Sequence, residues 1–260
     1  MKFIQCVQNA NEQVNIQDTI YAIKNAGFDG VFIQWYDDNL EFSQQPQVDL
    51  CRQLGLSIEF CHLGYSGINN LWTEGVDGDN LVTKYIRNLQ ECKDNNINLV
   101  IMHLCSKYVA PPPSLIGIKR LKAIVQKAEE LEIKIAFENT KLWGYLEYVF
   151  DNIKSENIGV CLDSGHLHCH FDNKYSWDRF KNKIFALHLH DNDKSKDQHL
   201  LPFDGTIDWK DLCSKIKLAN YTGPLTLESC YKNNYTQIPL TEFYINSMSR
   251  AKDLFDIYNK

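Results

Sequence analysis

The sequence has no hydrophobic run long enough to cross a membrane, and its amino terminus, MKFIQCVQNANEQ, lacks the apolar segment and cleavage site of a secretory signal. Its nine cysteines include no C-x-x-C pair, which disfavours zinc-thiolate sites and disulfides. Most of these cysteines lie in apolar runs such as FIQCV and GVCLDS, as is typical of buried thiols in a reducing compartment. We therefore expect a soluble cytoplasmic protein with no membrane partner.

Excess positive charge is also missing. Lys and Arg number 27 against 33 Asp and Glu, which gives a formal net charge of −6 and a pI of about 5.7. Proteins that derive their affinity from phosphate backbones usually carry clustered Lys and Arg, so the composition disfavours a nucleic-acid partner. The first apolar run is followed by VQNANEQ and not by a G-x-G-x-x-G loop. A dinucleotide site is therefore disfavoured, and we expect no organic cofactor.

Eight short apolar runs alternate with amphipathic stretches along the whole chain. The runs are KFIQCV, GVFIQW, SIEFCHL, NLVIMHL, KIAFENT, IGVCLDS, IFALHLHD and PLTLESC. Residues 16–27 and 113–132 have the apolar spacing of helices, and the first of these segments ends on a glycine suited to a helix cap. Strands that are apolar on both faces and alternate with helices require a parallel sheet covered by helices. The sequence therefore predicts an α/β fold, a (β/α)8 TIM barrel that forms one domain over residues 1–260.

Six consecutive strands of this predicted barrel end on a histidine or a carboxylate. These residues are His62, His103, Glu138, Asp163, His188 and Glu228. The carboxyl ends of barrel strands converge on one mouth, where active sites are built. Each residue alone could be an ordinary solvated side chain, but carboxylates gathered around one mouth repel one another and need a compensating charge. A divalent cation supplies that charge, and imidazole and carboxylate donors without thiolate indicate Mn, Zn, Co or Mg.

The stretch VCLDSGHLHCH, residues 160–170, begins as a strand and is expected to continue as a loop. Asp163 would be a metal ligand at the rim, and the small Ser164 and Gly165 would let the backbone turn so that His166 faces the same centre. His190 follows His188 by strand alternation and therefore faces the same side. We expect His190 to support His188 or to contact substrate.

Several motifs in matching order resemble one known superfamily over nearly the whole chain. The motifs are FENT, LDSGH, HLHDND, DQHLLPFDGTIDW and LES, and they resemble those of the xylose isomerase-like TIM barrels, which include apurinic-site (AP) endonucleases of the endonuclease IV type. In its sugar isomerases and epimerases, one divalent metal is held at positions that resemble Glu138, Asp163, His188 and Glu228. The resemblance implies a sugar or polyol substrate whose adjacent oxygens bind the metal. Glu138 and Glu228 would then move a proton through an enediolate, with His166 bonded to a substrate oxygen.

The same motifs leave other functions open. The endonuclease branch holds three zinc ions with added ligands that resemble His62, His103, His166, Asp197 and His199. A multi-metal phosphodiesterase of the AP endonuclease type is therefore an alternative. Related barrels also act as lyases that dehydrate polyols and keto acids, and a catalytically inactive sugar-binding subunit is a third alternative. The acidic composition and the short loops at the mouth favour the isomerase or epimerase.

Two tryptophans are candidates for substrate contact. Trp35 ends the second strand and would either offer an aromatic platform to a sugar ring or cap the barrel interior. Trp72 lies in the stretch GYSGINNLWTEG, where it would enter the site or pack on a neighbouring subunit. No strand end offers a cation, so we expect a substrate without phosphate. The resemblance is compatible with a homo-oligomer.

Overall fold

A computed structural model describes residues 1–8, 14–35, 44–106, 109–171 and 177–260. Eight parallel strands follow one another around a ring in the order β7-β6-β5-β4-β3-β2-β1-β8. The strands are β1 (Phe3–Val7), β2 (Gly30–Trp35), β3 (Ser57–Leu63), β4 (Leu99–Met102), β5 (Lys134–Glu138), β6 (Ile158–Asp163), β7 (Ile184–His188) and β8 (Leu225–Leu227). Each lies within its predicted run. The ring closes just past β7, where Leu189 N donates to Thr226 O (2.9 Å) and Leu189 O accepts from Glu228 N (3.0 Å).

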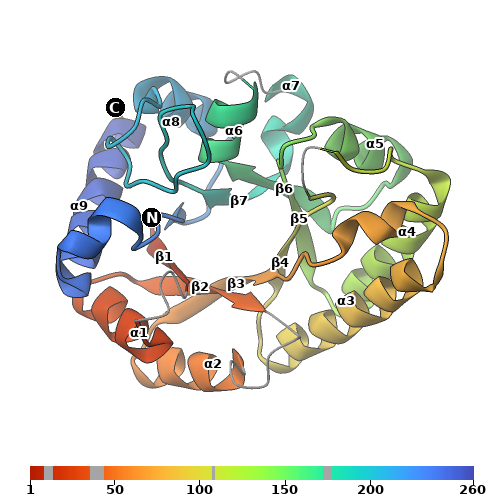
Figure 1. Cartoon of the computed structure of the whole chain (residues 1–260), viewed down its shortest axis with the longest axis horizontal. Helices are drawn as coiled ribbons and strands as arrows, with labels where there is room; N and C mark the ends of the chain where they lie inside the picture. Colours follow the sequence, from red (N-terminus) through yellow and green to blue (C-terminus); the bar gives the residue numbers. More distant parts are fainter. Residues whose placement is uncertain (9–13, 36–43, 107–108, 172–176) are drawn as a thin grey trace.

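Helices surround this ring (Figure 1). They are α1 (Ile16–Asn25), α2 (Gln44–Gln53), η2 (Ile68–Trp72), α3 (Val76–Asp94), α4 (Leu115–Glu130), α5 (Gly144–Asn152), α6 (Ser164–Phe171), α7 (Trp177–Phe180), η3 (Lys181–Lys183), α8 (Trp209–Leu218), η4 (Asn233–Gln237) and α9 (Leu240–Asn259). Asn15 caps α1 by accepting from Gln17 N, and Gly27, at φ +91°, follows the end of this helix as predicted. No helix in the described part of the chain is long and apolar enough to cross a membrane. The predicted (β/α)8 TIM barrel is confirmed.

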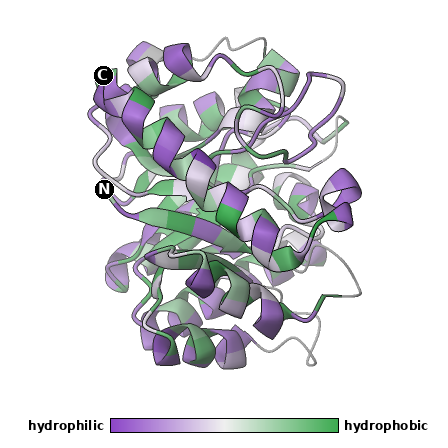
Figure 2. Ribbon diagram, turned by 90° about the vertical axis from the view of Figure 1, so that its left-hand side faces the viewer, coloured by the Kyte–Doolittle hydropathy of each residue, from purple (hydrophilic) through white to green (hydrophobic). Residues whose placement is uncertain are grey.

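Strand alternation divides the apolar side chains into two layers. One layer fills the barrel and consists of Ile4, Cys6, Phe32, Phe60, Ile101, Ala136, Cys161 and Ala186. The larger layer packs between the strands and the helices. Figure 2 shows strands that are mostly hydrophobic and helices that carry hydrophobic and hydrophilic residues together. Because side chains two residues apart share a face, the next inward positions form a ring of polar side chains at the mouth. These are Gln8, Gln34, His62, His103, Glu138, Asp163, His188 and Glu228.

The residues after β6 form a helix, so the expected loop is wrong. Helix α6 begins at Ser164, directly after Asp163. Asp163 Oδ1 accepts a hydrogen bond of 2.6 Å from His166 N, which satisfies one of the free amides in the first turn of the helix. The strand therefore passes into a helix without a connecting loop.

A buried arginine on α4 fixes the segment that joins β3 to α3. Arg120 is 5 % exposed and ion-pairs with Asp79 at 2.9 Å. Its guanidinium also donates to backbone carbonyl groups of this segment, at Asn70, Leu71, Thr73 and Gly75. A Cβ on Gly78 would stand 2.2 Å from Arg120 Nη1, so close packing requires glycine there. The segment that carries Tyr65 to the mouth of the barrel is therefore anchored at its far end.

Candidate metal centre and cavity

A cavity of about 580 Å³ opens at the carboxyl ends of the strands. This volume lies within the roughly 300–1,000 Å³ that is usual for small-molecule sites. Its lining includes seven of the predicted site residues, namely His62, His103, Glu138, His166, Asp197, His199 and Glu228. Asp163 and His188 are fully buried beside this lining, with 0 % exposure. The structure thus brings together the whole predicted set of histidines and carboxylates.

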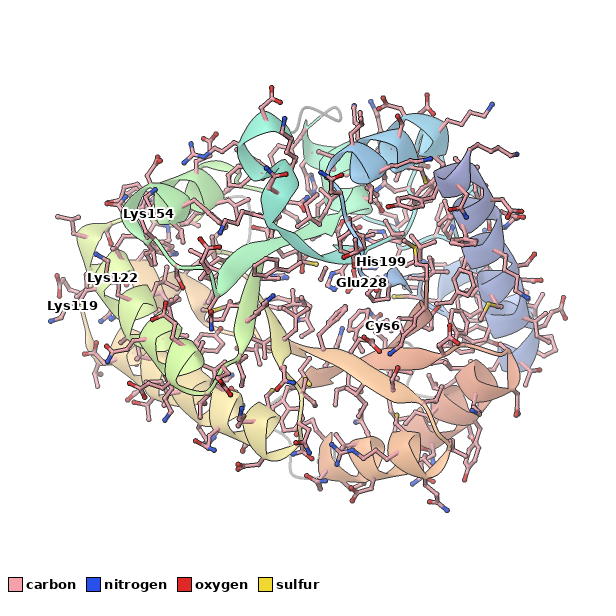
Figure 3. The ribbon with its side chains drawn as sticks, turned by 180° about the vertical axis from the view of Figure 1, so that it is seen from behind. Cys6, Lys119, Lys122, Lys154, His199 and Glu228 are labelled. Carbon is pink, nitrogen blue, oxygen red and sulfur yellow. The ribbon has the colours of Figure 1, made fainter. Side chains whose placement is uncertain are left out.

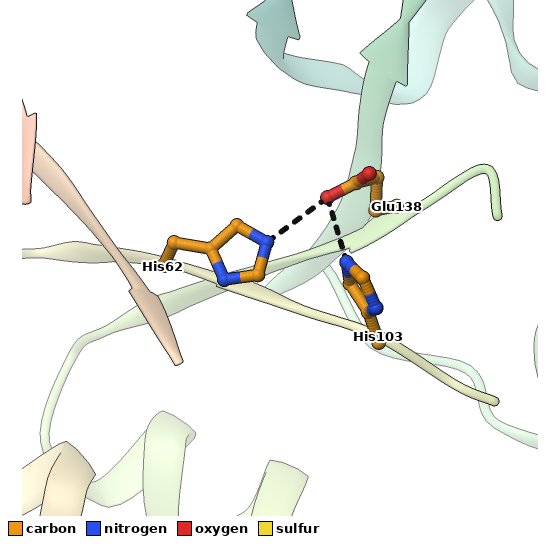
Figure 4. A group of neighbouring side chains, drawn as sticks. All are labelled: His62, His103 and Glu138. Atoms are coloured by element: carbon orange, nitrogen blue, oxygen red, sulfur yellow. Dashed lines mark hydrogen bonds and ion pairs between the residues drawn. The ribbon is translucent and has the colours of Figure 1, made fainter. Parts of the chain in front are cut away.

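Glu138 is the shared member of the first group. Its Oε2 atom lies 3.2 Å from Nε2 of His62 and 3.2 Å from Nε2 of His103, as Figure 4 shows. The three side chains come from neighbouring strand ends, and all three point toward a common centre. Burial opposes ionisation of Glu138, but the imidazoles of His103, His166 and His188 outweigh it and hold the pKa of this carboxyl well below its usual range. Glu138 is therefore a buried carboxylate anion among imidazoles.

His188 is the centre of the second group. Its Nδ1 atom lies 3.4 Å from Glu138 Oε2, 3.4 Å from Glu228 Oε2 and 4.0 Å from Asp163 Oδ2. Within the described residues, neither ring nitrogen of His188 has a hydrogen-bond partner of acceptable geometry, although the ring is fully buried. Such an orphaned buried nitrogen is costly unless a further group satisfies it. Phe32, stacked on the imidazole with 4.9 Å between ring centres, holds the ring in place.

These separations fit a divalent ion. Ligand atoms about 2.0–2.2 Å from one ion stand roughly 3–3.5 Å apart, which is the separation of His188 Nδ1 from both glutamates. Potential ligand atoms of Asp163, His188 and Glu228 all lie within 4.8 Å of one another. The donor set of three carboxylates and one imidazole suits Mn, Zn, Co or Mg. The residues present therefore fit the metal that the sequence predicts.

A third group lies beside the second. Asp197 Oδ2 is 3.3 Å from His166 Nε2 and 3.2 Å from His199 Nε2. His166 also links this group to the first, because its Nδ1 atom lies 3.0 Å from Glu138 Oε1. The D-x-H pair in the loop after β7 thus reaches the same cavity as the strand ends. Side chains are therefore arranged as metal ligands would be at more than one position in the cavity.

The pKa of Glu228 is shifted in the opposite direction to that of Glu138, the other candidate catalytic glutamate. Burial raises the pKa of Glu228 well above its ordinary value, and the charges of Glu138 and Asp163 add to the rise, against a lowering by His199. The pKa of Asp163 lies at about 2, because His166 and His190 outweigh the effect of burial. The charged form of Glu228 is therefore disfavoured by burial beside Glu138 and Asp163, which is the condition that a cation relieves.

His190 lies behind this cluster and does not line the cavity. Its Nε2 atom is 3.1 Å from Asp163 Oδ2, and its ring stacks on His199 with centres 4.1 Å apart. The side chain is fully buried, with 0 % exposure. Of its two expected roles, this position fits support of the cluster better than contact with substrate.

The two tryptophans lie away from the cavity. Trp35 packs in the layer between strands and helices, where Nε1 donates to Glu91 Oε2 (2.8 Å). It points outward because Gln34, the preceding residue on the same strand, points into the mouth. Trp72 packs against Gly117 of α4 and donates to Leu104 O (2.6 Å). Neither tryptophan lines the cavity, so the expectation that either contacts substrate is corrected. Trp72 packs against residues of its own chain.

Residues other than the two tryptophans line the cavity beside the predicted cluster. Tyr65 lines the cavity and stacks on His103, with ring centres 4.2 Å apart. Gln8 and Gln34 complete the inward ring on β1 and β2, and Lys232 reaches the cavity from the segment after β8. Strand alternation could have found Gln34, since it shares the inward face of Phe32. Lys232 carries no such local signal.

Comparison with known proteins agrees with this architecture. A structure described as a D-tagatose 3-epimerase-like protein superposes with a TM-score of 0.79 at 20 % identity, covering 100 % of this chain and 98 % of that one. A structure of IolI protein with a bound zinc atom superposes with a TM-score of 0.77 at 16 % identity, with 100 % and 98 % covered. At these identities the likeness establishes the fold alone.

Sequence comparison adds the family. The uncharacterized protein y4fM of Sinorhizobium fredii (strain NBRC 101917 / NGR234) is 41 % identical over 107 residues, which are 40 % of this chain and 33 % of that protein. This chain thus spans about a third of the length of that relative. The profile of the family described as xylose isomerase-like TIM barrel matches residues 20–252. With most of its length matched by that profile, the chain belongs to the xylose isomerase-like TIM barrel family.

Proposed function

We propose that the protein is a divalent-metal-dependent isomerase or epimerase of sugars or polyols. Glu138, Asp163, His188 and Glu228 would hold a Mn, Zn, Co or Mg ion, which would polarise a carbonyl group and offset the charge of the deprotonated substrate. The solved structures that share this fold include a D-tagatose 3-epimerase-like protein and an L-ribulose 3-epimerase, which supports sugar chemistry at low sequence identity.

The observation that carries the proposal is the placement of two glutamates at one cavity. Glu138 on β5 and Glu228 after β8 each bring an oxygen to 3.4 Å from the same nitrogen of His188, and both line the cavity. A small substrate in this cavity would therefore lie within reach of two carboxylates that come from different strands. Two such groups allow a proton to leave one face of a carbon and return to the other.

Each residue then has a defined task. One glutamate accepts the proton from the carbon beside the carbonyl group. For epimerisation, the other returns a proton to the opposite face of that carbon, and for isomerisation a proton goes to the adjacent carbon. His166 lines the cavity between Glu138 and Asp197 and is placed to donate a hydrogen bond to a substrate oxygen. The buried floor of Phe32, Phe60 and their neighbours excludes water from below.

Exchange of a carbon-bound proton tests this assignment directly. The protein loaded with Mn or Co is incubated in deuterated water with a panel of ketoses, cyclic keto-polyols and keto-glycosides, and deuterium incorporation is followed by mass spectrometry. The wild type is expected to label at least one substrate, whereas Glu228→Gln retains metal and loses the exchange. Glu130→Gln, on the exposed face of α4, is the matched control and should exchange normally. Absence of exchange across the panel would rule out the proposal.

One observation favours a second candidate. The groups around Glu138 and Asp197 add ligand-like geometry beyond a single ion, which is the arrangement that a multi-metal phosphodiesterase needs. That function predicts cleavage of bis-p-nitrophenyl phosphate or of a duplex with an abasic site, lost in His199→Ala. A protein that cleaves neither compound while exchanging sugar protons would leave the isomerase as the function.

A further inference from the structure

We propose that Lys232, together with Gln8 and Gln34, forms a subsite for an anionic group of the substrate, a carboxylate or a phosphate. The inference rests on the proposed function, since it assigns the substrate class of the same cavity. The substrate would be an acidic sugar or a sugar phosphate, with its reacting carbons among the glutamates and its anionic end at this subsite.

The ring of inward-pointing polar side chains at the mouth has two parts that differ in chemistry. Its six positions on β3 to β8 are histidines or carboxylates, whereas its two positions on β1 and β2 are the carboxamides of Gln8 and Gln34. Both glutamines line the cavity and are half-buried. Carboxamides have no charge and both donate and accept hydrogen bonds, so this side of the mouth can bind oxygens of a ligand without repelling an anion.

Lys232 adds the positive charge on that side. Among the described residues that line the cavity, it is the single Lys or Arg. Its side chain is half-buried, and its Nζ atom has no ion pair or hydrogen bond with any residue that the structure describes. Lys183, which is also half-buried, is by contrast paired with Glu156 at 3.0 Å. An ammonium group on a side chain that lines the cavity, without a partner among the described residues, is available to a ligand.

The backbone around Lys232 is tied to the metal cluster. Cys230 N donates to His199 O (3.0 Å), and Ser229 Oγ donates to Leu200 O (2.9 Å). Farther along, Tyr235 OH accepts from Leu201 N (2.9 Å). These bonds join the segment after β8 to the loop that carries His199, on both sides of Lys232. The backbone that carries this lysine is therefore held beside the cluster before a ligand arrives, which lowers the entropic cost of binding.

Charge then sets the orientation of the ligand. Four carboxylates belong to the cluster, namely Glu138, Asp163, Asp197 and Glu228. The charges of these carboxylates disfavour a second anion beside them, so the anionic end of a substrate is placed best beside Lys232 and the glutamines. The sequence predicts a substrate without phosphate because no strand end carries a cation. Lys232 is outside that prediction, because it lies beyond the end of β8, four residues after Glu228.

Binding measurements on the metal-loaded protein test the subsite. The probes are D-xylulose, D-ribulose and D-fructose, each compared by calorimetry with its terminal phosphate and with the acid in which the terminal CH2OH farthest from the keto group is a carboxylate. The wild type should bind one charged class more tightly than the neutral parent, and that class identifies the anion. Lys232→Met should weaken that binding about ten- to a hundredfold, the loss of one hydrogen bond to a charged group, with the neutral parent changed less than about twofold.

Two further variants complete the test. Lys232→Arg should retain the preference for the charged class, and Lys122→Met is the matched control. Figure 3 shows Lys122 on the outer rim, far from the centrally placed His199 and Glu228. Equal weakening of charged and neutral probes by Lys232→Met, or no charged probe that binds better than its parent, would overturn the subsite. Because these readouts are binding constants, an anion preference without proton exchange would reject the isomerase and keep the subsite.

Discussion

A Cβ atom on Gly165 would lie 1.9 Å from Cε1 of His190, so the glycine leaves the space that the imidazole fills. The adjacent Ser164 has a related role, since its Oγ donates to His190 O (2.7 Å) and accepts from His190 N (2.9 Å). The small residues of LDSGH therefore allow α6 to pack closely on the strand end of β7. They do not create the turn that the sequence suggests, because the helix begins there directly.

Replacing this glycine should weaken metal binding. In Gly165→Ala the ring of His190 must move, and it can no longer hold Asp163, whose Oδ2 atom now lies 3.1 Å from its Nε2. Loss of such a supporting contact typically lowers metal affinity about 10- to 100-fold. Competition with a chromophoric chelator measures the change. Gly144→Ala is the control, because a Cβ there meets nothing within 4 Å. Equal affinity in both variants would contradict the supporting role of His190.

Removing the metal should lower the melting temperature. An ion present at 100 times its Kd stabilises the folded state by about 2.7 kcal/mol. For a chain of this length that corresponds to roughly 5–10 °C, which differential scanning calorimetry with and without chelator can detect. His188→Ala should show almost no effect of the chelator. Phe60→Leu, beside His188 in the barrel, should keep the full effect, and a similar loss in that variant would indicate a packing defect.

Metal binding should release protons. Burial lowers the pKa of His166, but Asp163, Asp197 and Glu138 outweigh it and hold this pKa well above its usual range. His166 is therefore protonated near neutral pH in the metal-free protein, and the raised pKa of Glu228 favours its protonated form as well. Ligands bind a metal in their deprotonated forms, so affinity should fall as pH falls below these raised values. Calorimetry in buffers of different ionisation enthalpy counts the protons, and a count of zero would contradict this electrostatic account.

The anchor at Arg120 predicts a large loss of stability. Arg120→Met leaves four backbone carbonyls and Asp79 without the guanidinium that they share. Leaving a buried carbonyl group without its partner typically costs about 1–3 kcal/mol, and urea denaturation would show the loss as a lower midpoint. Lys127→Met, on the same helix and more exposed, should change stability by less than about 0.5 kcal/mol. Similar midpoints for both variants would refute the anchoring role.

Most of the fold could be predicted because its signals are local. Each strand of the barrel lies within an apolar run that stands out from the sequence, and the histidines and carboxylates at their ends converge because parallel strands share one direction. The error at Trp35 was avoidable, since Gln34 occupies the inward position and alternate residues face opposite sides. The helix after Asp163 was harder to predict, because three histidines in a short polar stretch carry weak helix preference.

Lys232 could not be predicted from local patterns. Its place at the cavity depends on hydrogen bonds between segments about thirty residues apart, such as that from Cys230 N to His199 O. The packing of Trp72 against Gly117 joins residues still farther apart in the sequence, so the sequence alone does not show that the tryptophan is unavailable to a ligand. Side chains on connecting segments are placed by these long-range contacts, which no periodicity reveals.

The measurement that tests the account most directly is the number and position of metal ions in the protein purified without chelator. Elemental analysis gives the ions per chain, and anomalous scattering from a crystal places them. The account predicts an ion held by Glu138, Asp163, His188 and Glu228, with further ions at His103 or at Asp197 and His199 only if the phosphodiesterase is the function. A protein that takes up no divalent ion at His188 when Mn, Zn, Co or Mg is supplied would contradict it.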